Sequence, residues 1–349
     1  MGEPGSQRRR SFELAAVLLG VCLVPLGLRV VNTAVRPPDA APSYIPSIES
    51  PRVRGPFDSD AVATLREAAN DYILIGDSMA GTRINPGHLS RLIGGHGAAA
   101  LFHPGSGPAY WYLTFKNFVV NAALRPRAVV FFFRDENLTD TLFRAYPSSL
   151  DRVAQDREPV LDEILAARAN GTFFRVHRAL RRIYQYDQTR AWLEPIIVRA
   201  PVALSAGRRA RKKLLDSINN EVFTLEALRP TAASDMLAAR RDALDFSRNL
   251  PTSVLPEILR LSKASGVRVA FVRVQRRPAV DGPPPQSPAL QAYVRHLRAY
   301  LVANEAIYHD DWGDPDQPLS VYEDGDHVSR DFRRTYTEIF FRKNPEIFR

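Results

Sequence analysis

The stretch DYILIGDSMAGTRINP, residues 71–86, decides how the fold of this chain is interpreted. The apolar run YILI leads directly into Gly76-Asp77-Ser78. A short apolar run that ends at a glycine is typical of a buried strand followed by a turn into a helix. Two interpretations of the serine follow. It either caps the helix, or it presents a nucleophilic hydroxyl at the edge of a sheet.

Helix and strand patterns alternate on both sides of a long central segment. Further strands are predicted at 98–102, 128–133, 267–274 and 306–310, and helices over 59–70, 85–94, 108–124, 253–265, 289–304 and after Ser329. Strands that alternate with helices predict a doubly wound parallel sheet, in which the wholly apolar strand AVVFFF suits the centre. Residues 139–250 show helical patterns without a convincing strand, and we interpret them as a helical insertion.

The first 35 residues have the pattern of a membrane anchor. Arg8-Arg9-Arg10 precede an apolar stretch, residues 14–28, which resumes after Arg29. A helix here is just long enough to span a bilayer as an N-terminal transmembrane helix, with Arg29 reaching toward a headgroup. A cleaved signal peptide is the alternative, but no small-residue cleavage site follows, so we favour an uncleaved anchor. The basic tail predicts a cytoplasmic N-terminus.

This orientation predicts a single-pass protein of the cytoplasmic membrane. The proline-rich residues 36–58 would form a tether, and residues 59–349 an α/β domain outside the cytoplasm, in the periplasm or at the cell surface. The net charge of +9 suits an anionic partner. Zinc-finger and RNA-binding signatures are lacking, so we do not expect nucleic acid. Cys22 is the single cysteine, which excludes an intrachain disulfide and a cysteine-based metal site, and we predict no metal or cofactor.

A second polar motif lies near the other end of the chain. In YEDGDHVSRDF, residues 322–332, Asp324 and His327 are three positions apart in a glycine-containing loop before the last helix. A serine nucleophile needs a base, and the base needs a carboxylate that orients it. The alternative for this motif is a solvated turn, which is how we interpret Asp326. The G-x-S-x-G elbow of α/β-hydrolases is absent around Ser78.

Gly76-Asp77-Ser78 after the first strand and Asp324-x-x-His327 before the last helix resemble the SGNH (GDSL-type) hydrolase superfamily. The resemblance extends over residues 71–134 and 255–340. It implies a flavodoxin-like α/β fold and acyl transfer through a serine. Carried over by position, Ser78 matches the nucleophile, His327 the general base and Asp324 its orienting partner.

The resemblance also implies an oxyanion hole. Its donors would be the backbone N–H of Ser78, a glycine after the second strand, and an asparagine side chain after the third. HPGSG offers Gly105, or as a less favoured alternative Gly107. The G-x-N-D motif of the family is replaced by FFFRDENL, in which Asn137 or Arg134 would take the third position.

Other side chains are candidates for substrate binding. They are Asp77, His103, Arg134 and Trp111. Each has a structural alternative for its role. Asp77 suits hydrogen bonds to the backbone of its own loop, His103 suits a packed position, and the helix that carries Trp111 suits the core. Asn137 suits a loop or helix cap equally well.

The departure at the third motif occurs in membrane-tethered members that resemble alginate and cell-wall acetylation proteins. Those act on polysaccharide outside the membrane, often beside a membrane-bound O-acyltransferase. We therefore expect serine-dependent O-acyl transfer, with acetyl the expected group, on or off a cell-surface or secreted polysaccharide. One alternative is an esterase or lipase of the same fold. Another is a catalytically inactive scaffold that binds a polysaccharide or a partner protein.

Overall fold

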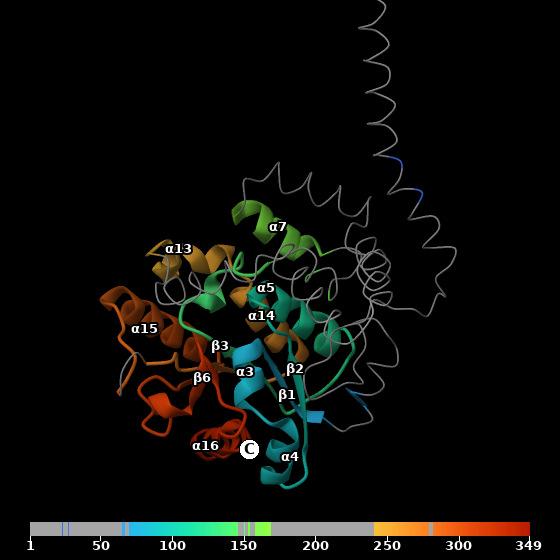
Figure 1. Cartoon of the computed structure of the whole chain (residues 1–349). Coiled ribbons are helices and arrows are strands. Elements are labelled where there is room, and N and C mark those ends of the chain that lie inside the picture. The colour runs from blue at the N-terminus through green and yellow to red at the C-terminus, as the bar shows by residue number, and fades with distance from the viewer. Residues whose placement is uncertain are drawn as a thin grey trace, which may run out of the picture. The chain divides into compact units, whose positions relative to one another are not determined.

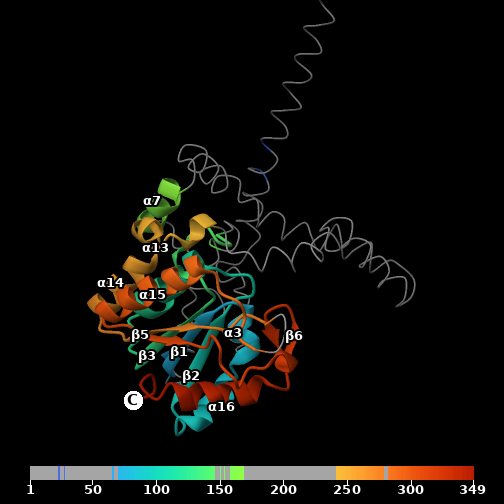
Figure 2. The same cartoon turned by 90° about the vertical axis from the view of Figure 1, so that its left-hand side faces the viewer.

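The structure, a computed structural model, describes residues 70–145, 158–168, 241–278 and 282–349, with Leu23, Gly27, Leu65, Arg66, Leu150 and Val153. Apart from Leu23 and Gly27, these residues belong to one compact unit of the chain, made of residues 41–171 and 236–349 (Figures 1 and 2). None of the described helices is long and apolar enough to cross a membrane. The predicted anchor and tether, residues 1–58, lie outside the described part except for two residues of the anchor.

Five strands form the central sheet. They are β1 (Asn70–Gly76), β2 (Gly97–Phe102), β3 (Ala128–Phe133), β4 (Val269–Arg273) and β5 (Ile307–Asp310). Their order is β2-β1-β3-β4-β5, and every neighbouring pair is parallel. This confirms the predicted doubly wound parallel sheet. The strand order reverses between β1 and β3, which is where open α/β sheets bind ligands.

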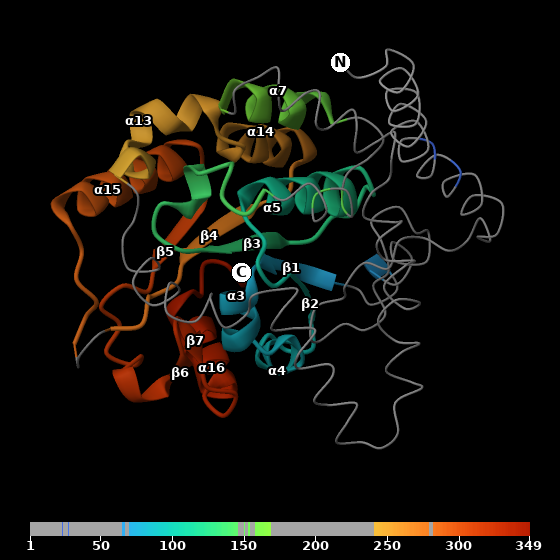
Figure 3. The same cartoon turned by 45° about the horizontal axis from the view of Figure 1, so that its top comes forward.

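Helices cover both faces of the sheet (Figure 3). One layer contains α5 (Pro108–Thr114), η1 (Phe115–Val120), α14 (Leu255–Ser265) and α15 (Pro288–Ala303), and the other contains α3 (Ser78–Arg83), α4 (Pro86–Leu92) and α16 (Arg333–Lys343). Neighbouring β3 side chains point into opposite layers. The ring of Phe131 packs against Phe115 and that of Phe132 against Phe340, with centroids 5.7 Å and 5.4 Å apart. Strand β3 is therefore buried over its whole length.

The helix predicted over 108–124 is shorter and changes type. It is α-helical to Thr114 and continues as a π-helix to Val120. Ala123 then adopts φ of +55°, a left-handed conformation that an α-helix of L-residues cannot contain. The chain thus turns toward β3 before the predicted end of the helix.

The described part of the predicted insertion, 139–250, contains only helical elements. They are the end of η2 (Asn137–Thr139), then α7 (Pro159–Arg168), η4 (Arg241–Leu244) and α13 (Phe246–Asn249), and the start of η5 (Leu250–Thr252). The ring of Phe246 lies 5.7 Å from Tyr293 and 5.8 Å from Tyr300 of α15, between ring centroids. These helices lie over the α14 and α15 layer (Figure 3).

The segment 322–332, predicted as a loop, is partly a small sheet. Strand β6 (Tyr322–Asp324) follows the turn η6 (Leu319–Val321) and pairs antiparallel with β7 (His327–Val328). Gly325, at φ of +42°, allows the tight reversal between them. The prediction of a plain loop was wrong here because the pairing is too short to produce an alternating pattern.

Candidate active site

Ser78 lies where β1 turns into α3, at the carboxyl edge of the sheet. It is the first residue of the helix, and the residue before it is the cap. The Asp77 carboxylate accepts a hydrogen bond from the backbone N–H of Met79 at 2.9 Å. The interpretation of Ser78 as a helix cap is therefore wrong, and its hydroxyl is available for another contact.

Gly76 is a steric requirement of this turn. A Cβ atom added at Gly76 would lie 2.8 Å from the Cβ of Ala80 and 3.2 Å from the Cβ of Phe132. The first distance is shorter than real Cβ contacts allow. The strand can deliver Ser78 to the edge of the sheet in this geometry because glycine precedes Asp77.

His327, the first residue of β7, provides the partner of Ser78. Its Nε2 lies 2.9 Å from Ser78 Oγ, although 249 positions separate the two residues in the sequence. This is the distance at which an imidazole can take the proton of a serine hydroxyl as general base. The structure thus brings together the predicted nucleophile and the predicted base.

Asp324 lies opposite His327 in the β6–β7 hairpin. Directly opposed residues of an antiparallel pair have Cβ atoms about 4.5–5.5 Å apart, which is within reach of a carboxylate and an imidazole. The Asp324 side chain is outside the described part of the structure. Its role in orienting His327 stays a prediction.

The predicted oxyanion donors lie at the carboxyl ends of β1, β2 and β3. Among the described residues, no acceptor is found for the backbone N–H of Ser78 or of Gly105, or for the Asn137 side chain. Gly105 has φ of +72°, and the position of a Cβ there faces open space. Asn137 is buried in η2. Donors without acceptors at this edge are what an oxyanion requires.

Gly107, the less favoured alternative to Gly105, has a steric role. A Cβ added there would lie 2.1 Å from the carbonyl oxygen of Phe143. Glycine is therefore required for the close approach of the segment after η2 to the start of α5.

Two of the candidate substrate contacts already have structural partners. Besides capping α3, the Asp77 carboxylate lies 3.4 Å from Arg144 Nη1, and the Arg144 guanidinium stacks on Phe143 at 4.9 Å from the ring centroid. The prediction that Asp77 bonds to the backbone of its own loop is confirmed. Trp111 is 1% exposed, and its indole N–H donates to Ser106 Oγ at 2.9 Å. Trp111 is thus a core residue, and we correct its assignment as a substrate contact.

His103 is also packed inside the protein rather than exposed to a substrate. It is buried, and its ring stacks on Tyr110 with centroids 4.7 Å apart. Its backbone N–H donates to the carbonyl oxygen of Gly76 at 3.0 Å. We therefore assign His103 to the structural alternative, as part of the packing that supports the Ser78 turn.

Arg134 joins the third motif to the hairpin that carries His327. Its Nη1 lies 2.5 Å from Asp326 Oδ2, and both side chains are largely buried. Asp326 also accepts hydrogen bonds from the backbone N–H of Arg277 and, through its carbonyl oxygen, from Arg83. Burial by itself would raise the pKa of Asp326, but the charge and hydrogen bond of Arg134, the Arg277 N–H and the charge of Arg276 together outweigh this and lower it. Asp326 is not the solvated turn residue that we predicted, and Arg134 is already ion-paired.

A second ionic cluster holds the residues between Arg134 and Asn137. Asp135, at φ of +44°, lies 2.6 Å from Arg273 Nη2 and also pairs with Arg276. Arg273 in turn lies 3.0 Å from Asp310 at the end of β5. Burial, followed by the negative charge of Asp135, raises the pKa of Glu136. Ionic partners on β4, β5 and the hairpin thus fix the backbone that leads to Asn137.

These partners of the active-site loops were not predictable from the sequence. Asp326 and Arg273 lie far along the chain from the segment that they hold, and Arg83 holds Asp326 through its carbonyl oxygen. In the sequence each resembles an ordinary surface charge. The one signal was the replacement of G-x-N-D by R-D-E-N, in which new charges require new partners. No group of His, Cys, Asp and Glu suited to a metal ion is found among the described residues.

No family model matches the sequence, and no curated protein matches it. Among solved structures, the chain is similar to a provisionally assigned acylhydrolase from Bacteroides fragilis, at 12% identity and a TM-score of 0.39 over 84% of this chain and 98% of that one. It is also similar to a GDSL-like lipase from Bacteroides thetaiotaomicron, at 13% identity and a TM-score of 0.35 over 81% of this chain and 94% of that one. The similarity to GDSL-like lipase and acylhydrolase structures is therefore distant.

Proposed function

We propose that this protein transfers acyl groups through Ser78, with His327 as the general base. The observation that carries the proposal is the 2.9 Å contact between Ser78 Oγ and His327 Nε2, at the strand-order reversal of the sheet. The donors at Ser78, Gly105 and Asn137 support it, because acyl transfer through a serine needs a site for negative charge on the carbonyl oxygen.

The reaction proceeds in two halves. His327 takes the Ser78 proton as Oγ bonds to the ester carbonyl carbon, and the carbonyl oxygen gains negative charge beside the open N–H donors. Collapse of this intermediate breaks the bond to the alcohol oxygen, which leaves with the proton from His327. The acyl-enzyme is then attacked by water or by a sugar hydroxyl whose proton His327 accepts, and Ser78 is restored.

We propose a polysaccharide as the substrate, with acetyl as the group moved and transfer to a sugar hydroxyl as the preferred outcome. The net charge of +9 and the proposed membrane anchor in residues 1–35 support a domain that works at a cell surface. A membrane-bound O-acyltransferase is the partner proposed to supply the acyl group. Hydrolysis by the same machinery is the nearest alternative, since water and sugar hydroxyls attack alike.

Covalent labelling tests the activated serine. The full-length chain is treated with a fluorescent fluorophosphonate, beside Ser78→Ala and His327→Ala. We expect labelling of the unmodified chain only, because the probe bonds to a serine oxygen that a base has activated. Ser265→Ala, at the far end of α14, is the matched control and should label like the unmodified chain.

The outcomes separate the proposal from the scaffold alternative. Labelling that survives Ser78→Ala would place the reactive group elsewhere. No labelling of folded, unmodified chain would favour a catalytically inactive scaffold that binds a polysaccharide or a partner. If Ser78 is labelled, acetate release from an acetylated oligosaccharide is compared with acetyl transfer to an unacetylated one, which distinguishes esterase from transferase.

A further inference from the structure

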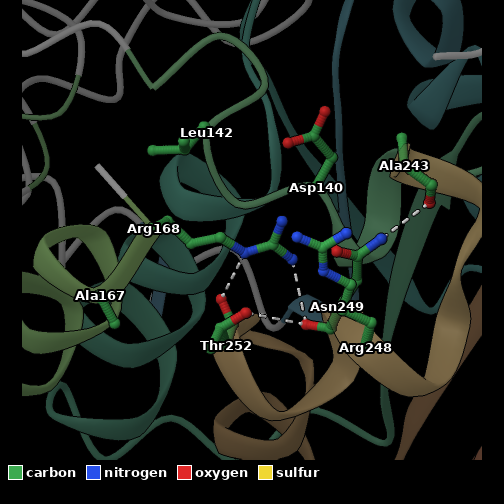
Figure 4. A pocket seen from close by; sticks show the side chains of 8 residues that line it. All are labelled: Asp140, Leu142, Ala167, Arg168, Ala243, Arg248, Asn249 and Thr252. Carbon is green, nitrogen blue, oxygen red and sulfur yellow. Dashed lines mark hydrogen bonds between the residues drawn. The ribbon is translucent and has the colours of Figure 1, made fainter. Parts of the chain in front are cut away.

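A cavity of about 430 Å³ is lined by Asp140 and Leu142, which follow η2, and by residues of the helical insertion (Figure 4). It lies between the residues after η2, the end of α7 and the α13–η5 turn, so the described part of the insertion builds most of its wall. Its charged lining residues are Asp140, Arg168 and Arg248. None of them belongs to the Ser78 and His327 pair.

Three backbone carbonyl oxygens hold Arg168 in this wall. Its guanidinium donates to the backbone carbonyl oxygens of Thr139 and Asn249, each at 3.1 Å, and of Thr252 at 3.3 Å. All three acceptors are neutral, and no carboxylate pairs with Arg168 among the described residues. The hydrogen bonds therefore orient the group, and none of these partners brings a negative charge to it.

Arg248 adds a second positive charge to the same cavity. Its backbone N–H is bound by the capping carboxylate of Asp245 at 3.0 Å, while its exposed side chain has no ion pair with any described residue. Figure 4 shows the guanidinium groups of Arg168 and Arg248 both turned into the cavity, and the Asp140 carboxylate turned away from them. No ion pair joins Asp140 to either arginine in this part of the chain.

The cavity is also connected to the candidate active site by a short stretch of chain. Asn137 begins η2, Asp140 and Leu142 line the cavity, and Arg144 pairs with Asp77 beside Ser78. Four residues of extended chain span at most about 14 Å, which bounds the distance between the Cα atoms of Asp140 and Arg144. We take a polymer seated at Ser78 to reach the cavity with a unit a few sugars away along its chain.

We propose that this cavity binds an anionic oxygen group, a carboxylate or a sulfate, on a sugar unit near the acylated position of the substrate. The inference rests on the proposed function, since it takes the substrate to be a polysaccharide. Two guanidinium groups suit an oxyanion: Arg248 can donate two parallel hydrogen bonds to it. Arg168 can donate through Nη1, because backbone carbonyl oxygens already accept from its Nε and Nη2. The protein would thus select acidic over neutral polysaccharides.

Binding measured without turnover tests this. The full-length chain carrying Ser78→Ala is titrated calorimetrically with oligogalacturonate, sulfated dextran and neutral dextran fragments of similar length. We expect at least one acidic oligomer to bind more than tenfold more tightly than the neutral one. Adding Arg248→Gln should weaken the binding of that acidic oligomer about tenfold, because charge-assisted hydrogen bonds are lost. The affinity for neutral dextran should not change.

Arg298→Gln is the matched control, because Arg298 is an exposed arginine of α15 without a described ion pair. It removes the same charge outside the cavity and should change no affinity. Equal weakening by Arg248→Gln and Arg298→Gln would mean general charge attraction and would overturn the site. So would acidic oligomers that bind no better than neutral ones. Which acidic oligomer responds tells carboxylate from sulfate. Fluorophosphonate labelling of Ser78 is independent of these affinities, so either proposal can fail alone.

Discussion

Two turns at the carboxyl edge of the same sheet are held in different ways. The turn at Gly76-Asp77-Ser78 is fixed mainly within itself, by the cap from Asp77 to Met79 and the close approach to Ala80. The segment from Arg134 to Asn137 is fixed by partners far along the chain, with Asp326 192 positions away and Arg273 138 positions away. A turn that neighbouring residues fix can be recognised in the sequence, whereas ion pairs between distant residues cannot.

The largest expected effect concerns the chemistry that the first turn presents. Ser78→Ala or His327→Ala should lower kcat/KM for 4-nitrophenyl acetate by at least about 10⁴-fold, because nucleophile and base act as a unit. The thermal midpoint should change little, since neither side chain is part of the core. Ser265→Ala serves again as the control. A Ser78→Ala protein with activity within tenfold of the unmodified chain would contradict the assignment.

The next effect breaks the second turn. Arg134→Gln should lower the free energy of unfolding by about 3 kcal/mol, because it leaves the largely buried Asp326 carboxylate without its ionic partner. Urea denaturation measures this. Replacing both residues, as Arg134→Met with Asp326→Leu, should recover most of the loss, since no charge is then left unpaired. A single-variant loss below about 1 kcal/mol would mean that solvent already compensates Asp326.

A steric clash in the first turn is expected to lower the free energy of unfolding less than Arg134→Gln does. Gly76→Ala should lower the free energy of unfolding by about 2 kcal/mol, because its Cβ would overlap the side chain of Ala80. Adding Ala80→Gly should restore part of this stability. Gly87→Ala in α4 is the matched control, since its nearest contact is an ordinary 3.6 Å. Equal effects of Gly76→Ala and Gly87→Ala would show that the turn tolerates a side chain.

The cap of the first turn contributes a smaller amount. Asp77→Ala should lower the free energy of unfolding by about 1 kcal/mol, the usual value for a lost helix cap. Asp77→Asn keeps an acceptor for the Met79 N–H and loses only the ion pair to Arg144, so it should cost less. Denaturation of both variants under identical conditions orders them. Equal costs of the two variants would assign the stabilisation to the ion pair rather than to the cap.

The smallest expected effect is the loss of stability when the pH is lowered from 7 to 4. The pKa of Asp326 is lowered in the folded state, so its stabilising contribution is complete above the unfolded pKa and is lost as pH falls toward the folded value. Between pH 7 and pH 4 this loss only begins, because the unfolded pKa of an aspartate is about 3.9. The urea midpoint should fall between pH 7 and pH 4, and this fall should be slightly larger for the unmodified chain than for Asp326→Asn. Equal changes in the two proteins would contradict the lowered pKa.

Several features were predictable because they depend on neighbouring residues. The apolar strands followed by helices predicted a parallel sheet, and the order of its five strands agrees with the flavodoxin-like fold that the family resemblance implied. The pair of Ser78 and His327 was also predicted, and the structure brings the two residues within hydrogen-bond distance. Trp111 and His103 were predicted as candidate substrate contacts but are packed in the structure. A sequence pattern does not distinguish a buried aromatic residue from one beside a site.

The sequence alone determined the periodic elements and the residue types of a nucleophile and its base. These depend on backbone geometry and on contacts within a few residues, which every chain encodes locally. Only the tertiary structure decided that Asp77 rather than Ser78 caps α3, that Asp326 is bound to Arg134, and that Arg168 and Arg248 turn into one cavity. Such pairings depend on which segments the fold brings together, because charges reach one another through space and not along the chain.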